Sequence, residues 1–433
     1  MPGDMPGDMP GDMPGDMPGR ALRGGAVTGG LLEPAERVSP GWIARFALAW
    51  IGLYAGLFGP LQILLPQQVE ALAPQGKEAA LAVVLGAGAA CSLVANPLFG
   101  ALSDRTRSRF GSRRPWIAVG FAGGALAIGL LAAAPAIPLV VLGWCAVQIL
   151  LNAPFAALSA TVPDVVPAAQ RGTAAGYLGL AFVLGVGLGS GLAVLAGATT
   201  TGYLLCALFA LAACVPYVVA GREGRRAPAE PWRWGAFLRG FWIDPVRHPD
   251  FGWGWLTRFL INLGNAIVLL YLFFFLSDVV GLPEPATGVL VLTAVYSVAM
   301  LGSVVVVGVL SDRVGRRRVF VTGGGVLMAA AAVLIATWAS WPGAIAAAVA
   351  LGIGFGAYSS VDFALLTQVL PNAEDRGKDL GVLNIASSLP QVLAPAIAAP
   401  IVTGLGGYTA LYLVAAGIEL AGAVLVYRIR SVP

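Results

Sequence analysis

The sequence predicts an all-α integral membrane protein whose twelve transmembrane helices form two pseudo-symmetric six-helix bundles. Three observations support this fold class: long apolar segments, a low content of charge, and an internal repeat. Hydrophobic residues make up 58% of the chain and charged residues 11%, whereas about a quarter of the residues in soluble domains are charged. A helix that crosses a bilayer needs roughly 20 consecutive apolar residues, and the chain supplies such segments repeatedly.

The apolar segments set approximate boundaries for the twelve expected helices. They cover residues 42–65, 79–102, 116–135, 138–162, 172–196, 202–220, 251–276, 286–310, 319–339, 343–369, 380–403 and 408–427. The two bundles should then occupy residues 41–221 and 251–433. Residues 1–40 open with MPGD repeats, a composition that buries little apolar surface, so we expect a disordered, low-complexity cytoplasmic tail. In the linker at 222–250, Trp and Phe alternate with Arg, which predicts an interfacial amphipathic helix.

The basic residues predict how the chain is oriented in the membrane. All 26 Lys and Arg residues except Lys77 and Arg258 lie in the tail, in the linker or near one end of the spans. Basic loops close to helix ends stay on the cytoplasmic side. We therefore expect a multi-pass protein of the cytoplasmic (plasma) membrane with both termini in the cytoplasm. This topology accounts for the net charge of +4 without a nucleic-acid partner.

The two halves of the chain repeat each other. GWIARF at 41–46 matches GWLTRF at 254–259, and GALSDR at 100–105 matches GVLSDR at 308–313. Arg171-Gly172 and Arg376-Gly377 form a third pair in the same order. Duplicated six-helix halves underlie transporters in which one bundle rocks against the other around a site at the membrane midplane.

The loops in this repeat resemble a known family. GALSDRTRSRFGSRRPW at 100–116 and GVLSDRVGRRR at 308–318 resemble the loop signature of the major facilitator superfamily, a Gly, an Asp-Arg pair, and then a Gly and paired arginines. The longer first copy looks like that of the sucrose and glycoside-pentoside-hexuronide cation symporter branch, and PDVVPAAQRG at 163–172 is similar to the end of helix four in that branch. The resemblance implies an alternating-access carrier in which helices one, four, seven and ten line a central cavity.

Several features depart from the branches of this family. Drug–proton antiporters usually carry an arginine in helix four and a Gly-Pro motif in helix five, whereas this chain has Gln148, Asn152 and the proline-free GVGLGSG at 185–191. Helices one and two contain no acidic residue, which disfavours the sodium coupling of some symporters. Helix four also lacks the arginine and aspartate of sucrose transporters, so the sugar specificity stays open. The glycines of helix five should let it pack backbone to backbone against its neighbours.

The charged loops predict a cytoplasmic gate. Asp104 and Asp312 end helices two and eight, where a carboxylate can face the N-terminus of a neighbouring helix and pair with loop arginines. We expect such contacts to favour the outward-facing state and to break when the carrier opens inward. The alternative that some of these arginines only determine topology remains open. The predicted gate comprises Asp104, Arg105, Arg113, Arg114, Asp312, Arg313, Arg316, Arg317, Arg171 and Arg376.

Polar residues at helical spacing predict the lining of the cavity. Polar side chains in a membrane are costly unless they face protein or water, so polar stripes mark the inward faces of helices. For any one of these residues, an interhelical hydrogen bond without a ligand role is an equal alternative. The candidates are Tyr54, Gln62, Gln148, Asn152, Arg258, Asn262, Asn265, Tyr358, Asn384 and Gln391.

Two acidic residues deep in the helices are candidates for proton coupling. An ionised carboxylate in the middle of a membrane helix costs about 2.5 to 3.5 kcal/mol on insertion scales, which favours proton uptake. Asp362 in helix ten is the first choice, and Glu419 in helix twelve is the second choice or a packing partner. Arg258 could hold a substrate hydroxyl or carboxylate, or it could pair with Asp362.

These observations predict a secondary active transporter. It would move a small polar organic solute, in the first place a sugar or glycoside, by proton symport, as a monomer in the lipid bilayer. The alternatives are an exporter of hydrophobic or amphipathic compounds and a non-transporting membrane assembly or sensor protein on the same fold. The sequence has no nucleophile–base set, metal-ligand spacing or nucleotide-binding loop, so we expect neither an enzyme nor a bound metal or cofactor.

Overall fold

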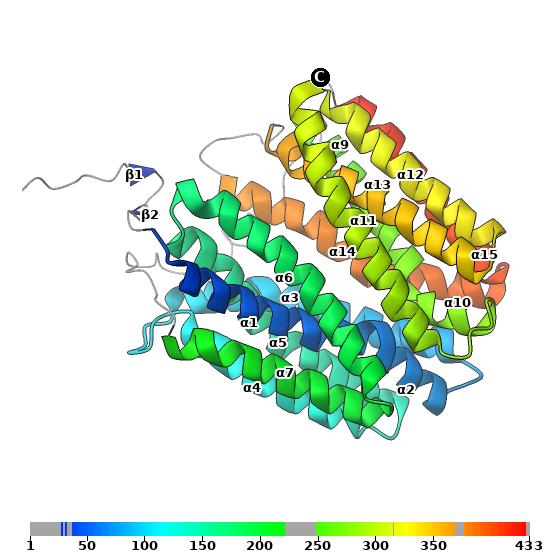
Figure 1. The fold of residues 1–433 in the computed structure, drawn as a ribbon, viewed down its shortest axis with the longest axis horizontal. Coiled ribbons are helices and arrows are strands. Elements are labelled where there is room, and N and C mark those ends of the chain that lie inside the picture. The colour runs from blue at the N-terminus through cyan, green and yellow to red at the C-terminus, as the bar shows by residue number, and fades with distance from the viewer. Residues whose placement is uncertain are drawn as a thin grey trace, which may run out of the picture.

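The computed structural model describes residues 27–28, 31–32, 37–220, 248–314, 316–368 and 376–429. In this part of the chain, twelve helical segments are long and apolar enough to cross a membrane. They form two helical bundles that lie side by side (Figure 1). The predicted all-helical membrane fold is confirmed.

The first bundle contains six spans, and the first of these changes its helical form partway along. Ser39 caps this span, since its side-chain oxygen accepts a hydrogen bond from the backbone N–H of Trp42 at 3.2 Å, as at many helix N-termini. The elements of the span are α1 (Pro40–Gly59), the π-helical segment η1 (Pro60–Leu64) and α2 (Leu65–Leu72). The others are α3 (Lys77–Arg105), α4 (Arg114–Ala132), α5 (Ile137–Val165), α6 (Ala168–Leu195) and α7 (Thr199–Ala220).

The second bundle begins with a span that breaks near its far end. Tyr271 leaves helical geometry, with φ −110° and ψ 21°, and so separates α9 (Pro249–Leu270) from α10 (Leu272–Asp278). The remaining elements are α11 (Pro285–Val314), α12 (Arg317–Thr337), α13 (Trp341–Gln368), α14 (Arg376–Gly404), α15 (Gly407–Leu425) and the 3₁₀ turn η2 (Val426–Arg428). Observed helix ends lie within about four residues of the predicted ones, except that the first span continues to Leu72, seven residues beyond its predicted end.

The predicted tail and linker lie largely outside the described residues. In the tail, β1 (Val27–Thr28) and β2 (Leu31–Leu32) pair in antiparallel fashion, and the sequence analysis did not anticipate this short hairpin. The predicted interfacial helix falls at 221–247, which the structure does not describe.

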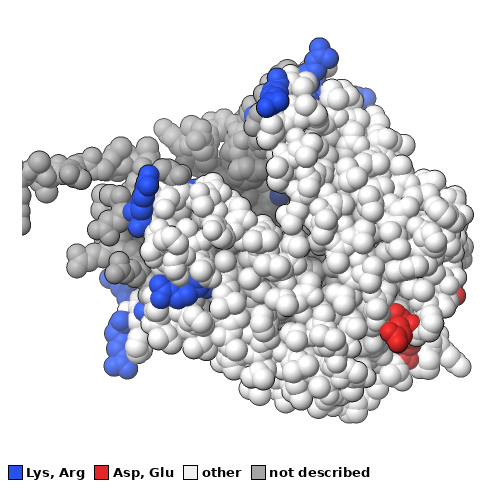
Figure 2. Space-filling model, viewed as in Figure 1, with Lys and Arg blue, Asp and Glu red and all other residues white. Residues whose placement is uncertain are grey.

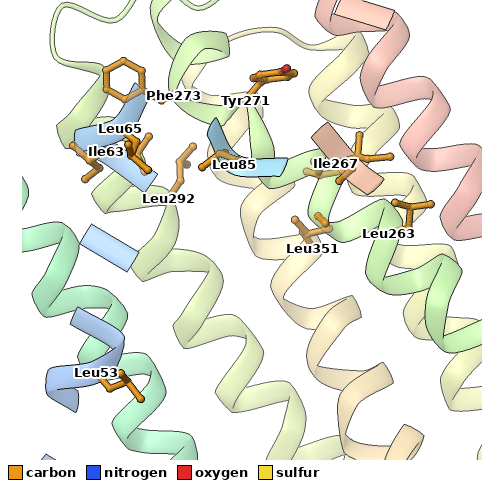
Figure 3. Packing of buried hydrophobic residues seen from close by; sticks show 14 of the residues in the cluster. Leu53, Ile63, Leu65, Leu85, Leu263, Ile267, Tyr271, Phe273, Leu292 and Leu351 are labelled. Atoms are coloured by element: carbon orange, nitrogen blue, oxygen red, sulfur yellow. The ribbon is translucent and has the colours of Figure 1, made fainter. Parts of the chain in front are cut away.

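Apolar side chains fill the bundles and also cover their outer surface. Figure 3 shows buried members of the cluster from both bundles, among them Ile63 and Leu65 from the first and Leu292 from the second. On the outside, Leu126 and Leu130 are each 66% exposed. A soluble protein rarely exposes so much contiguous apolar surface, whereas lipid tails would cover it.

The two ends of the molecule carry opposite charge (Figure 2). The end where α3 stops and α4 begins, near Arg105 and Arg114, is called the basic end. The acidic end is the opposite one, where α2 and α10 end at Leu72 and Asp278. The neighbouring helices α6 and α11 approach each other toward the acidic end and diverge toward the basic end (Figure 1).

Candidate functional site

A cavity of about 220 Å³ lies between the two bundles. Its described lining includes polar and aromatic side chains but none that is charged at neutral pH. Four of the predicted cavity residues lie here, namely Gln62, Asn262, Asn265 and Gln391. The other polar and aromatic lining residues are Thr293, Ser297, Tyr296, Phe58, Phe182 and Phe355. The site therefore offers amide and hydroxyl groups together with aromatic faces, and no formal charge.

Gln62 connects the two bundles at the cavity. It lies in the π-helical segment η1, and such segments often occur at functional sites because they shift a side chain out of the regular helical register. The Oε1 atom of Gln62 accepts hydrogen bonds from Ser190 Oγ in α6 at 3.1 Å and from Thr293 Oγ1 in α11 at 3.3 Å. The hydrogen bond between Gln62 and Thr293 therefore joins the two bundles at the cavity, and it breaks if the bundles move apart there.

The polar stripe of α9 faces the second bundle and the cavity. Asn262 Nδ2 donates to the backbone oxygen of Arg258 at 2.8 Å and to the hydroxyl of Tyr358 at 3.4 Å. Asn265 is buried and hydrogen-bonds to Tyr296 of α11. Tyr296 and Asn265 together form part of the cavity wall.

Arg258 and Asp362 form an ion pair between α9 and α13. Nη1 of Arg258 donates to Oδ2 of Asp362, and Nε of Arg258 donates to Ser387 Oγ of α14 at 2.7 Å. Tyr358 also hydrogen-bonds to the Asp362 carboxylate. Asp362 is buried, so its charge is balanced by a direct partner. Of the two roles that the sequence allowed for Arg258, the structure shows the pairing with Asp362.

Three other predicted cavity residues lie inside the first bundle and are not part of the described lining. Asn152 is buried between α5 and α3, where its Nδ2 donates to Ser92 Oγ at 2.9 Å and its Oδ1 accepts from Asn96 at 3.1 Å. Gln148 lies one turn before Asn152, and Tyr54 stacks on Trp50 at 5.3 Å. The contacts of Asn152 are therefore interhelical, and Tyr54 also packs edge-on against the cavity-lining Phe182 of α6 at 5.0 Å. The side chain of Asn384 lies outside the described residues.

Two of the predicted gate residues, Arg113 and Asp104, pair within the first bundle. Arg113 pairs with Asp104 at 2.5 Å and with Asp164 at 3.3 Å, and it also donates to Ser103. Arg113 is buried, so these contacts fix the ends of α3, α4 and α5 together. The sequence analysis did not include Asp164, although it lies in the motif at 163–172.

This geometry corrects one expectation about the gate. We expected the Asp104 contacts to break when the basic ends separate. The Arg113–Asp104 pair is formed although the bundles diverge toward that end (Figure 1). Both residues belong to the same bundle, so the movement of one bundle relative to the other leaves their distance unchanged.

The remaining gate residues make local contacts or are not described. Arg114 Nε donates to the backbone oxygen of Val218 at 2.9 Å, which ties α4 to the end of α7. Arg105 and Arg171 donate to backbone oxygens near their own positions. Arg313 and Arg316 are exposed, and Arg317 begins α12. The side chains of Asp312 and Arg376 lie outside the described residues.

An inter-bundle contact that the sequence analysis missed lies at the acidic end. Lys77 Nζ of α3 lies 2.7 Å from Glu70 Oε1 in its own bundle and 2.6 Å from Asp278 Oδ1 in the other. Tyr408 of α15 reaches Glu78 Oε1 and Asp278 Oδ2, both at 3.1 Å. We call this set the acidic latch.

Two aromatic residues of the second bundle complete the acidic latch. Tyr271, at the break between α9 and α10, donates its hydroxyl to the backbone oxygen of Glu78 at 2.8 Å. Nζ of Lys77 lies 4.8 Å from the ring centroid of Phe274, within the range of a cation–π contact. The sequence held a signal for this latch, because Lys77 is the single basic residue in a loop on the side opposite the others.

The fold and the site define the class of the protein. Two six-helix bundles that enclose a cavity with polar groups between them and contact each other at the acidic end are the architecture of a secondary transporter. Consistent with this, the sequence pattern of the Major Facilitator Superfamily matches residues 47–305 and 285–433. The chain belongs to this superfamily, and it is a membrane-embedded transporter of a small molecule and not an enzyme.

Solved structures show the same fold at low sequence identity. A mutant of the nucleoside transporter NupG superposes with a TM-score of 0.72 at 11% identity, over 90% of this chain and 99% of that one. The human organic anion transporter MFSD10 (TETRAN) superposes with a TM-score of 0.66 at 16% identity, over 90% of this chain and 100% of that one. A bacterial homolog of the human lysosomal transporter Spinster, in an inward-facing and unoccupied conformation, superposes with a TM-score of 0.64 at 15% sequence identity. The match covers 90% of this chain and 96% of that one. No curated protein matches the sequence.

Proposed function

We propose that this transporter moves a small neutral polar solute, a sugar or glycoside, by proton symport. In this proposal the protein works as a monomer in the cytoplasmic membrane, and the basic end and both termini face the cytoplasm. The observation that carries the solute class is the uncharged cavity between the bundles.

The chemistry of the cavity favours hydroxyl-rich solutes. The amides of Gln62, Asn262, Asn265 and Gln391 each carry donors and an acceptor, and can therefore pair with hydroxyl groups. Aromatic rings such as Phe58 and Phe182 can pack against the apolar face of a sugar ring. A charged solute would lose its hydration there without a compensating charge in the described lining, which is costly. The volume of about 220 Å³ is below that of pockets for drug-sized ligands, roughly 300 to 1,000 Å³.

The Arg258–Asp362 pair supplies a mechanism for coupling. A proton on Asp362 would remove the negative charge that holds Arg258, so the guanidinium could turn to another partner. Asn262 links this pair to the cavity, because it bonds to the Arg258 backbone and lines the cavity. Proton binding and solute binding would thereby act on the same helix, α9.

Transport in proteoliposomes tests this proposal. Purified full-length protein is reconstituted, and uptake of radiolabelled hexoses, glucosides and nucleosides is measured with and without an imposed pH gradient. We expect the gradient to drive accumulation of at least one neutral solute. We also expect Asp362→Asn to abolish accumulation while preserving solute exchange, whereas Glu284→Gln, at the acidic end, behaves as the unmodified protein. Proton symport is refuted if the uptake of every solute tested is the same with and without the pH gradient. Full accumulation of solute by Asp362→Asn would also refute it.

The apolar part of the cavity favours a second candidate, export of an amphipathic compound. Val186, Leu269, Leu292 and Met300 line the cavity beside the amides, so an amphipathic molecule could bury an apolar portion there. Expression in a sensitive host distinguishes the two candidates. An exporter raises resistance to such compounds, whereas a sugar symporter does not. A non-transporting assembly or sensor protein would show neither uptake nor resistance.

A further inference from the structure

Glu419 is the most deeply buried acidic side chain among the described residues. It lies on α15 with 0% exposure, and neither of its carboxyl oxygens has a hydrogen-bond partner in the described part of the chain. By contrast, the buried Asp362 carboxylate pairs with Arg258 and bonds to Tyr358. The two deep acids of the second bundle thus have opposite electrostatic environments.

A glycine on α9 creates the space for the Glu419 side chain. A Cβ atom at Gly264 would lie 2.2 Å from Glu419 Cγ and 3.1 Å from Glu419 Oε1. Any other residue at this position would displace the carboxyl group, since real contacts of this kind do not come below about 3 Å. Asn265, the next residue on α9, lines the cavity. The Glu419 carboxyl therefore lies against the residue of α9 that directly precedes one in the cavity lining.

The groups that face Glu419 are neutral. Helices α9, α12 and α14 pack against α15, and the described neighbour of the carboxyl group is Gly264 of α9. The described titratable groups nearby are the hydroxyls of Tyr296 on α11 and of Tyr412, which lies two helical turns before Glu419 on the same face of α15. Among the residues that the structure describes, Glu419 makes no ion pair. An ionised carboxylate in such a site would be uncompensated and strongly destabilising.

We propose that Glu419 is a second proton-binding residue of the transport cycle, protonated in this conformation while Asp362 is ionised. The inference rests on the proposed proton symport. Tyr296 and Asn265 form the wall between this carboxyl and the cavity and bond to each other. Oδ1 of Asn265 is buried and lacks a donor. A solute that draws the Asn265 amide toward the cavity would open this wall, so solute binding and proton exchange at Glu419 would be linked.

Proton release measured on the purified protein tests the inference. A solute that the uptake panel identifies is added to the full-length protein in weakly buffered detergent solution, and a pH-sensitive dye records protons released or taken up. Glu419→Gln keeps the shape and neutrality of the protonated acid, so its fold should survive. We expect this variant still to bind solute but with an affinity that depends less on pH, because linkage is reciprocal. We also expect it to lose at least half of the proton signal and to accumulate less solute under a pH gradient.

Two comparisons make the result decisive. Tyr412→Phe removes another buried, unpartnered polar atom from the same helix and should leave the proton signal unchanged. Gly264→Ala should displace the Glu419 carboxyl and reduce the proton signal, as Glu419→Gln does. An unchanged proton signal and full accumulation in Glu419→Gln would overturn the inference. If Asp362→Asn is uncoupled in the same assays, the proposed symport still stands, whereas a wild-type protein without any proton signal refutes the proposed function itself.

Discussion

Arg258 and Asp362 are oppositely charged residues that stabilise each other inside the second bundle. Each lies in a membrane helix, and neither could remain there as a lone charge at low cost. Their pairing converts two costly groups into a nearly neutral unit. Buried ion pairs contribute little net stability compared with apolar packing, but the loss of one partner is severe. The pair therefore limits which amino-acid substitutions the second bundle tolerates at these two positions.

Substitution of Arg258 alone should destabilise the protein far more than substitution of both partners. We expect Arg258→Gln to lower the free energy of unfolding by about 3 to 5 kcal/mol, because Asp362 would be left buried without a cation. The double variant Arg258→Gln with Asp362→Asn should recover most of this loss. Thermal unfolding of the purified protein in detergent measures both effects. Equal losses in the single and the double variant would show that the two charges are not coupled.

At the scale of elements, close helix packing distinguishes the two faces of α6. A Cβ atom at Gly189 would lie 2.6 Å from the backbone oxygen of Ala55, and one at Gly185 would lie 2.8 Å from that of Ile51. These two glycines let α6 approach α1 backbone to backbone, as the sequence predicted. Gly187 and Gly191, by contrast, have open space where a Cβ would point. The contact is therefore made by one stripe of the helix, and the remaining glycines do not take part.

This difference predicts the effect of two neighbouring substitutions. Gly189→Ala should destabilise the protein by about 1 to 3 kcal/mol, the usual cost of overpacking, because backbone atoms cannot move aside as side chains can. Gly187→Ala is the matched control and should leave stability unchanged or slightly higher, since alanine favours the helix. Melting temperatures of the two variants test this. A drop of equal size in both would contradict the assignment of the α6 face.

At the scale of the whole molecule, the sequence was sufficient for the fold and only partly sufficient for the site. Hydropathy and the internal repeat predicted the spans because a membrane helix must be long and apolar. Polar spacing located Gln62, Asn262, Asn265 and Gln391 on the cavity, but it could not tell these from Asn152, whose partners Ser92 and Asn96 lie on another helix. Such pairings depend on how helices are rotated, which a single helix does not encode.

Other site residues carried a signal that was overlooked. Thr293, Tyr296 and Ser297 follow i, i+3, i+4 on α11 and line the cavity, and so share one helix face as the polar residues of α9 do. The acidic latch depends on the break at Tyr271 and on contacts between distant helices. The sequence marked only Lys77, and its partners became evident from the fold.

The acidic latch holds the arrangement described here. It joins the bundles at one end while they diverge at the other (Figure 1), which is one of the two states that an alternating-access carrier must visit. Removal of Lys77 would leave Glu70 and Asp278 close together as like charges. Hydrogen bonds to charged groups contribute about 1.5 to 3 kcal/mol each, enough to change the ratio of the two states more than tenfold.

Distances between spin labels at the acidic end and at the basic end, measured in the unmodified protein and in Lys77→Gln, test this account most directly. One label pair at Gln75 and Val279 reports on the acidic end, and another at Thr173 and Val314, on α6 and α11, reports on the basic end. We expect Lys77→Gln to lengthen the first distance and to shorten the second, whereas Glu284→Gln changes neither. Rocking of two rigid bundles around the central cavity requires this reciprocal change. A longer distance at the acidic end with no shortening at the basic end, or no change at either, would contradict alternating access in this protein.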